Sequence, residues 1–161
     1  MPLSRENYIR DVELTIANKL LDNNIEFFDI KIGVKHFSNK FTKNLFNFIA
    51  KRIVDIGVCS RHTLADFIEN VEVNSMMEEN NIPTDFEEFS VWLSGLEQNR
   101  LDIKKLARIT IEDFNKRSLY NVLGDALTWL EDPNKSVGEI FRKTSYEVDS
   151  LMYDSDNEIE F

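Results

Sequence analysis

An uninterrupted helical pattern over residues 101–130 constrains the fold of this chain more than any other feature. No proline breaks it, and at about 1.5 Å per residue such a helix is roughly 40 Å long, too long for a small compact head. Asp132-Pro133 ends the pattern, because a residue before proline avoids the α region. Ser136 and Glu139 form a capping box at the start of another helix. Two helices joined by so short a connection fold back on each other, so we expect an antiparallel helical hairpin.

The composition favours an all-α fold. Of the 161 residues, 42% are hydrophobic and 12 are Phe, which is enough to bury a core without disulfides or metals. Only 5 Gly and 3 Pro are present, far fewer than a turn-rich β fold uses. We therefore expect a compact multi-helix head over 1–98, the hairpin over 99–153, and an acidic tail or linker over 154–161.

The head should contain about five helices. Three of them begin at residues that can cap a helix: Ser4, Ser60 and Thr84. The strongest pattern spans 39–56, and Gly57 follows it where a left-handed C′ residue belongs. Residues 69–83 are the least periodic stretch and are expected to be mostly loop.

The charge argues against a general nucleic-acid surface. The formal net charge is −10, whereas phosphate binding needs clustered Lys and Arg. The basic residues that do gather alternate with Phe side chains: Lys35, Lys40, Lys43, Lys51 and Arg52. A surface that tracks phosphates is one interpretation of this cluster, but the polar face of a core helix explains it better.

No constellation of catalytic, cofactor-binding or metal-binding residues is present. His36 and His62 lack partners at ligand spacing, and the acidic residues of 154–160 lack the Gly and the final Glu of a calcium loop. Cys59, the single cysteine, suits a core position in a reducing compartment. Neither a signal peptide nor a membrane span appears, so we expect a cytoplasmic protein.

The apolar residues of the expected hairpin spread over more than one face of each helix. The excess must meet the head, a second copy or another protein, and an exposed apolar patch usually marks an interface. We expect these residues to form a protein interface: Leu119, Leu123, Leu127, Leu130, Phe141, Val148 and Leu151.

A set of short motifs covers residues 6–153 in a fixed order. Its members in the head are Glu13, Ile16, Leu20, Leu21, Phe37, Leu45, Phe46, Ile49, Gly57, Thr63 and Leu64. A long helix, an Asp-Pro turn and a shorter helix follow. This order resembles the N-terminal domain of DnaB-type replicative DNA helicases. Where the family has Gly, His and Asp, this chain has Asn18 or Ala17, Thr42 and Ser60, which suggests a distant, phage-encoded member.

The resemblance implies a role in DNA replication. In that family the hairpins pair, as a dimer or as a trimer of dimers in a full ring, and the resulting collar binds primase and helicase loaders. In the family, the ATPase belongs to a following RecA-like domain, which this chain lacks. The resemblance therefore implies that the chain is the N-terminal part of an ATP-dependent helicase. The alternatives are a stand-alone loader or helicase inhibitor of the same fold, the helicase-binding domain of a primase, and an unrelated helical adaptor.

Overall fold

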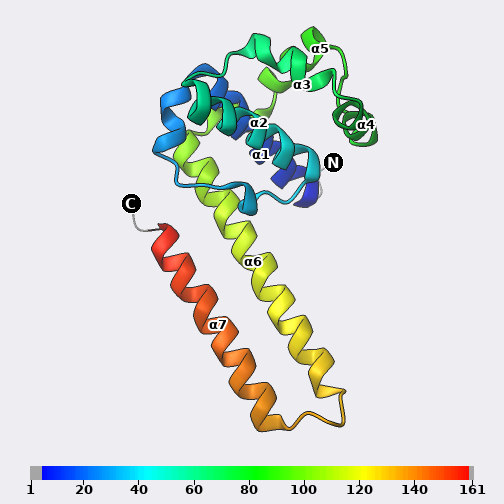
Figure 1. Ribbon diagram of the computed structural model, residues 1–161, viewed down its shortest axis with the longest axis vertical. Helices are drawn as coiled ribbons and strands as arrows, with labels where there is room; N and C mark the ends of the chain where they lie inside the picture. The colour runs from blue at the N-terminus through cyan, green and yellow to red at the C-terminus, as the bar shows by residue number, and fades with distance from the viewer. Residues whose placement is uncertain (1–4, 160–161) are drawn as a thin grey trace. The chain divides into compact units, whose positions relative to one another are not determined.

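The structure, a computed structural model, describes residues 5–159, with side chains described for 5–152. Within this range it contains seven α-helices, four short 3-10 helices and no strand, so the predicted all-α class is confirmed (Figure 1). The chain divides into two compact units, Met1–Thr110 (unit 1) and Ile111–Phe161 (unit 2), which are described separately below.

The first helix, α1 (Arg5–Asp22), runs through the core of unit 1. Its apolar stripe of Ile9, Val12, Ile16 and Leu20 is buried, but so are residues on its other sides, such as Leu14 and Ala17. Polar residues of α1 are buried as well, including Glu13 and Thr15. Thr15 satisfies its hydroxyl by donating to the carbonyl of Asp11 at 2.7 Å, as a buried hydroxyl in a helix must. The predicted cap, Ser4, lies outside the described residues.

The second helix, α2 (Lys40–Ile56), has the start and stop that its sequence indicates. The side chain of Asn39 accepts hydrogen bonds from the backbone N–H groups of Phe41 and Thr42. Gly57 ends the helix with φ +93°, a left-handed conformation that glycine adopts without a steric penalty. The apolar stripe of α2 is buried against the rest of unit 1, with Leu45 and Ile49 fully enclosed.

Four 3-10 helices connect the larger elements of the chain: η1 (Asn24–Phe28), η2 (Val34–His36), η3 (Arg61–Thr63) and η4 (Glu97–Arg100). Ser60 precedes η3 without forming a side-chain cap, although the sequence predicts one. The hydroxyl of Thr63 donates instead to the carbonyl of Ser60 at 2.5 Å.

Three short helices complete the outer part of unit 1: α3 (Leu64–Ile68), α4 (Val71–Glu79) and α5 (Phe86–Ser94). The expectation that 69–83 is mostly loop is wrong, because α4 occupies most of that stretch and the side chain of Asn70 caps it. The predicted cap of α5 is one residue too early. The side chain of Asp85, rather than Thr84, accepts from the N–H of Glu88 at 3.1 Å.

The long helix α6 (Ile103–Leu130) begins in unit 1 and continues into unit 2. Its first two turns carry side chains that are buried, including those of Ile103, Leu106 and Ala107. These apolar residues belong to the core of unit 1, which is why the compact unit extends beyond the boundary of 98/99 that the sequence suggests.

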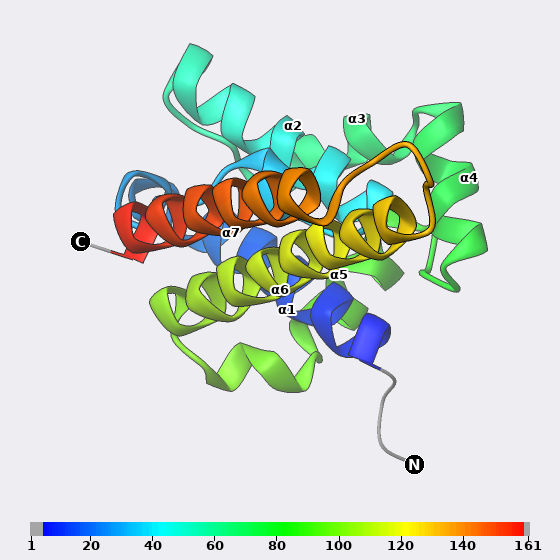
Figure 2. The same cartoon turned by 90° about the horizontal axis from the view of Figure 1, so that it is seen from below.

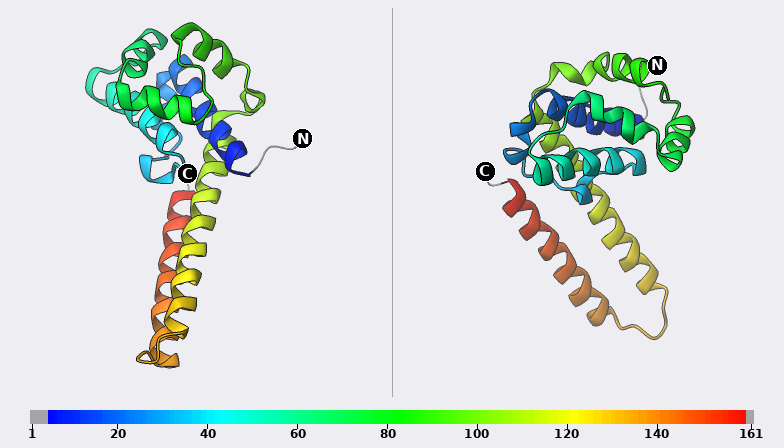
Figure 3. Two further views of the ribbon diagram at one scale, coloured as in Figure 1. Left: turned by 90° about the vertical axis from the view of Figure 1, so that its right-hand side faces the viewer. Right: turned by 45° about the horizontal axis from the view of Figure 1, so that its top comes forward.

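Unit 2 consists of the remainder of α6 and of α7 (Val137–Ile159). Figures 1, 2 and 3 show α7 running beside this part of α6 in the opposite direction. The hydroxyl of Ser136 accepts from the N–H of Glu139 at 3.1 Å, so the cap predicted at this position is confirmed. The backbone of α7 stays helical to Ile159, through most of the segment that the sequence assigns to a tail, and the side chains there lie outside the described residues.

Candidate functional site

The two units differ sharply in how many of their apolar side chains are buried. Unit 1 encloses nearly all the buried apolar side chains, whereas in the described part of unit 2 only Ile111 and Ile140 are buried. Nine large apolar residues of unit 2 are exposed instead. Large exposed apolar patches are uncommon on proteins that act alone and usually mark an interaction site. The surface of unit 2 is therefore the candidate functional site.

On α6 the exposed apolar residues form one stripe. Leu119, Leu123, Leu127 and Leu130 are spaced by three or four residues, which places them on one side of a helix. Their exposed fractions are 41%, 49%, 65% and 58% respectively. A different side of the same helix carries the half-buried residues Val122, Ala126 and Trp129.

A matching stripe runs along α7. Val137, Phe141, Val148 and Met152 recur at helical spacing, and three of them are 61–75% exposed, while Val148 is half-buried. The row of α7 that is turned to its neighbour contains the buried Ile140 and the half-buried Thr144 and Leu151.

The two stripes lie on the same side of unit 2. At about 100° per residue, each stripe is displaced by roughly a quarter turn, in the same rotational sense, from the half-buried row of its own helix. Because α6 and α7 run in opposite directions, equal displacements bring both stripes to one side of the pair. We call the eight residues of the two stripes the unit 2 face: Leu119, Leu123, Leu127, Leu130, Val137, Phe141, Val148 and Met152.

Six of the seven residues predicted to form an interface belong to the unit 2 face. The exception is Leu151, which lies in the row between the helices. Sequence reasoning missed Val137 and Met152, together with Tyr120, which is 77% exposed at the edge of the α6 stripe. The spacing of Val137 and Met152 from Phe141 is a signal that could have revealed both.

The turn between the helices is held by two lysine side chains that lie against the ring of Trp129. The ammonium groups of Lys143 and Lys135 lie 4.1 Å and 5.6 Å from the centre of the Trp129 ring, within the range of cation–π attraction. The side chain of Asp132 accepts from the N–H of Asn134 at 2.9 Å, which closes the turn before α7. These contacts tie the end of α6 to α7, so the stripes are held close together at the turn.

Among the described residues of unit 1, Glu13 is the buried ionisable group with a shifted pKa. Burial raises its pKa, although hydrogen bonds from Thr42, Ser38 and Asn39 partly oppose that shift. The hydroxyl of Ser38 donates to the carboxylate at 2.7 Å and the hydroxyl of Thr42 at 2.5 Å. All the donors come from the start of α2 or the residues just before it. This arrangement joins α1 to α2 and is structural, because the two hydroxyls are buried or partly buried donors to the carboxylate and no second acid or base is among its hydrogen-bond partners.

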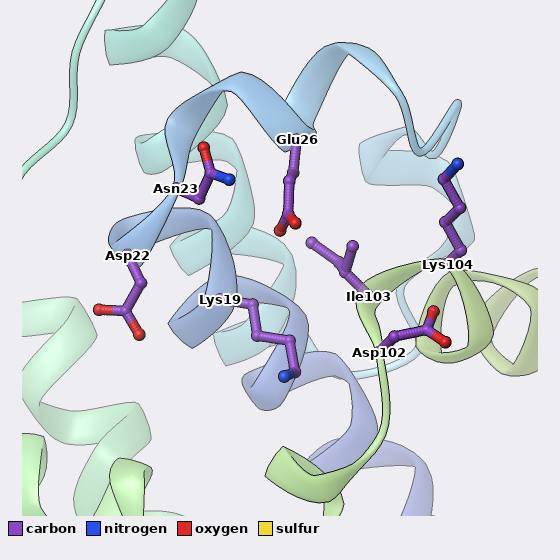
Figure 4. Close-up of a pocket in the computed structure, with 7 residues that line it drawn as sticks. All are labelled: Lys19, Asp22, Asn23, Glu26, Asp102, Ile103 and Lys104. Carbon is purple, nitrogen blue, oxygen red and sulfur yellow. The ribbon is translucent and has the colours of Figure 1, made fainter.

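A hollow in unit 1 collects charged residues without directing them at one point (Figure 4). It is lined by Lys19, Asp22, Asn23, Glu26, Asp102, Ile103 and Lys104. Lys19 donates to the carbonyl of Asn99 at 3.0 Å, and Asp22 pairs with Arg61 at 2.7 Å. In Figure 4 the carboxylates of Asp22 and Asp102 turn in different directions. The hollow therefore offers no convergent set of ligands.

The other chemistries weighed from the sequence find little support in the described residues. Nowhere in 5–152 do three His, Cys, Asp or Glu side chains gather as a metal would require. Of the three Phe side chains that separate the basic residues, Phe37 and Phe41 are buried in the core and cannot stack on bases. The third, Phe48, is half-buried, and the guanidinium of Arg52 lies 5.1 Å from its ring centre. Cys59 is buried, as predicted. None of the described helices is both long and apolar enough to cross a bilayer.

No known protein family, curated protein or solved structure matches this chain. The candidate site is therefore defined by the structure alone, as an exposed apolar surface on a pair of helices.

Proposed function

We propose that this protein is a docking module that associates with a second copy of itself through the unit 2 face. The observation that carries the proposal is the contrast between the units, since the described part of unit 2 exposes nine large apolar side chains and buries only Ile111 and Ile140. Burying a Leu or Phe side chain contributes about 1.5–3 kcal/mol when the burial is complete. The partly exposed residues of two such faces hold enough of this energy to drive association.

A second copy is the partner that the unit 2 face fits best. Between Leu119 and Leu130 the stripe on α6 carries no charge, and the stripe on α7 is uncharged as well. In a two-fold dimer the same surface of each copy meets at the interface, so a charged surface would meet like charges on its partner. A neutral surface avoids this repulsion. Two antiparallel pairs stacked in this way form a four-helix arrangement with a shared apolar core.

In finer detail, we propose that the module belongs to a replicative DNA helicase of the DnaB type, where it contributes to a collar that binds primase or a helicase loader. This step rests on the ordered motifs of the sequence. The layout of a helical unit followed by a long helix, an Asp-Pro turn and a shorter helix is consistent with it.

A charge placed within the unit 2 face tests the proposal. Leu127→Asp should weaken self-association by more than about tenfold, because each copy would bury an unpaired carboxylate at a cost of about 2 kcal/mol. Asn121→Asp adds the same charge to an exposed position on the opposite side of α6 and should leave association unchanged. Sedimentation velocity measures the association, and circular dichroism checks that both variants keep their helices.

Two results would contradict the proposal. In the first, the unaltered protein is monomeric at every concentration tested. In the second, Leu127→Asp unfolds the protein while Asn121→Asp does not, which would make Leu127 a core residue and not part of a surface.

A further inference from the structure

Four charged side chains border the unit 2 face, with one base and one acid on each helix. On α6, Lys116 continues the line of the stripe three residues before Leu119, and Glu131 follows its last member. On α7, Arg142 follows Phe141 and Asp149 follows Val148, which puts both on the edge of the face that is turned away from α6. All four are exposed, and we call them the border charges: Lys116, Glu131, Arg142 and Asp149.

The other charged side chains within 111–152 lie elsewhere in unit 2. Asp113 pairs with Arg117 at 2.8 Å. Asp125 and Glu139 are about 200° around their helices from the nearest stripe residues, so they lie on the opposite side of the pair. The rest lie at the turn, between the helices or beyond the end of the α6 stripe: Glu112, Asp132, Lys135, Lys143 and Glu147.

On each helix the border charges are centred on the apolar stripe. The midpoint of the α6 stripe falls between residues 124 and 125, and the midpoint of Lys116 and Glu131 falls between 123 and 124. The midpoint of the α7 stripe falls between 144 and 145, and that of Arg142 and Asp149 between 145 and 146. In each case the two midpoints differ by one residue, or about 1.5 Å. Each helix is therefore complementary in charge to a copy of itself that runs in the opposite direction.

We infer that two copies pair through the unit 2 face with their turns pointing in opposite directions. This inference rests on the proposed self-association and specifies its contacts. Each helix then lies antiparallel to its own counterpart, with the two-fold axis crossing the middle of both stripes. Arg142 of one copy meets Asp149 of the second copy, and Lys116 meets Glu131. Symmetry makes each of these contacts twice, at the edge of the shared apolar core.

A pairing with both turns at the same end lacks this match. It brings α6 of one copy against α7 of the other, because the two-fold axis is then parallel to the helices. With the stripes centred on each other, Arg142 lies opposite Leu127 and Asp149 lies opposite Tyr120, both of which are uncharged. Asp125, the nearest acid, is on the far side of α6. Charge complementarity therefore favours the antiparallel pairing.

Charge reversal with rescue tests the contact between Arg142 and Asp149. Arg142→Asp and Asp149→Arg each replace two attractive contacts per dimer with two repulsive ones, so each should weaken association about three- to tenfold. The double variant Arg142→Asp/Asp149→Arg has the net charge of the unaltered protein and restores both contacts. Its association should return to within about twofold of the unaltered protein. Sedimentation velocity measures each dissociation constant, and circular dichroism checks that the helices are retained.

Asp125→Arg is the matched control for Asp149→Arg. It makes the same change in net charge at an exposed position of unit 2 outside the proposed contact. Both substitutions make an acidic chain less negative, which by itself reduces repulsion between copies. Asp125→Arg should therefore not weaken association, whereas Asp149→Arg should.

The distance between the two turns tests the direction of pairing independently. Asn134 is exposed at the turn, and the only native cysteine, Cys59, is buried, so a spin label attaches selectively to Asn134→Cys. About ten residues separate the turn from the middle of the stripe, so antiparallel pairing should place the two labels roughly 30 Å apart. Turns at the same end would place them within about 20 Å. Double electron–electron resonance measures this distance.

The results separate failure of the arrangement from failure of self-association. A dimer whose labels lie within about 20 Å, or whose association is not restored in the double variant, would overturn the antiparallel pairing and leave self-association standing. An unaltered protein that stays monomeric at every concentration would overturn both.

Discussion

Glu13 shows how a single residue couples two helices of unit 1. Its carboxylate is fully buried and accepts hydrogen bonds from the backbone and hydroxyl of Ser38, the backbone of Asn39 and the hydroxyl of Thr42. A buried carboxylate is tolerated only when its oxygens are paired in this way. The donors surround the start of α2, so Glu13 holds that end of the helix against α1.

The stability of the protein should respond to the ionisation of Glu13. Burial raises the pKa of this carboxyl above its ordinary value of 4.5 in the folded state. The folded protein then binds the proton of Glu13 more tightly than the unfolded protein does, so protonation of Glu13 contributes to the free energy of unfolding. This contribution is fully present below the unfolded pKa and is lost as the pH rises through the folded pKa. The side chain of the Glu13→Gln variant cannot ionise, so we expect its free energy of unfolding to be free of this fall with rising pH.

Urea unfolding of both proteins between about pH 4 and pH 7 measures this effect. The free energy of unfolding of the unaltered protein should fall relative to that of Glu13→Gln as the pH rises over that range. Parallel curves for the two proteins would mean that Glu13 has the same pKa in the folded and unfolded states.

The residues that cap helices were easier to anticipate than Glu13. Gly57 and Ser136 act through their own backbone or through a neighbour three residues away, so local sequence identifies them. The role of Glu13 depends on donors 25 to 29 residues further along the chain. Periodicity indicates which face of a helix is apolar, but it does not show that a carboxylate will be enclosed by another helix.

At the scale of elements, the end of α2 depends on one glycine. With φ at +93°, a side chain at position 57 is strained even though nothing lies within 4 Å of an added Cβ. Gly57→Ala should lower the free energy of unfolding by about 1–2 kcal/mol. Gly124, within the exposed part of α6, also has open space around an added Cβ but no unusual φ.

Gly124→Ala is therefore the matched control for Gly57→Ala. It should raise the free energy of unfolding by about 0.5–1 kcal/mol, because alanine is the better helix former. Urea denaturation compares the two variants. Equal effects of the same sign would contradict the left-handed conformation of Gly57.

The helices predicted well are those with strong patterns. α2, α6 and α7 each carry a long apolar repeat and a marked start or end, and the structure places them close to where the sequence does. In α4 only Val73 and Met77 are buried, so two apolar residues in a helix of 9 residues leave hardly any periodicity to detect. The apolar excess on α6 and α7 was visible in the sequence, because its residues outnumber the positions that one contact face provides.

At the scale of the whole molecule, the chain combines a unit that encloses its own core with a unit that does not. Unit 1 buries Phe37, Phe41, Phe46 and Phe89 almost completely. Unit 2 leaves its apolar stripes in water. The boundary of 98/99 that the sequence suggests lies before α6, because a helical pattern alone does not reveal that Leu106 and Ala107 are buried.

The boundary between the units determines which fragment of the chain should fold without unit 2. A fragment ending at Asn99 would lose Ile103, Leu106 and Ala107 from the core of unit 1, whereas one ending at Thr110 keeps them. Removing buried apolar side chains costs about 2–5 kcal/mol for each large one, so the shorter fragment should be much less stable. Residues 1–110 are therefore the appropriate fragment for separating the two units, and circular dichroism should show that they remain helical.

Sedimentation velocity of the full chain and of residues 1–110, each over a range of concentrations up to about 100 µM, tests the central claim most directly. A range reaching that concentration detects association with a free energy of about 5.5 kcal/mol or stronger. We predict that the full chain shifts from monomer to dimer as its concentration rises, while the fragment stays monomeric and folded. A full chain that remains monomeric throughout, or a fragment that dimerises as strongly as the full chain, would contradict the assignment of self-association to the unit 2 face.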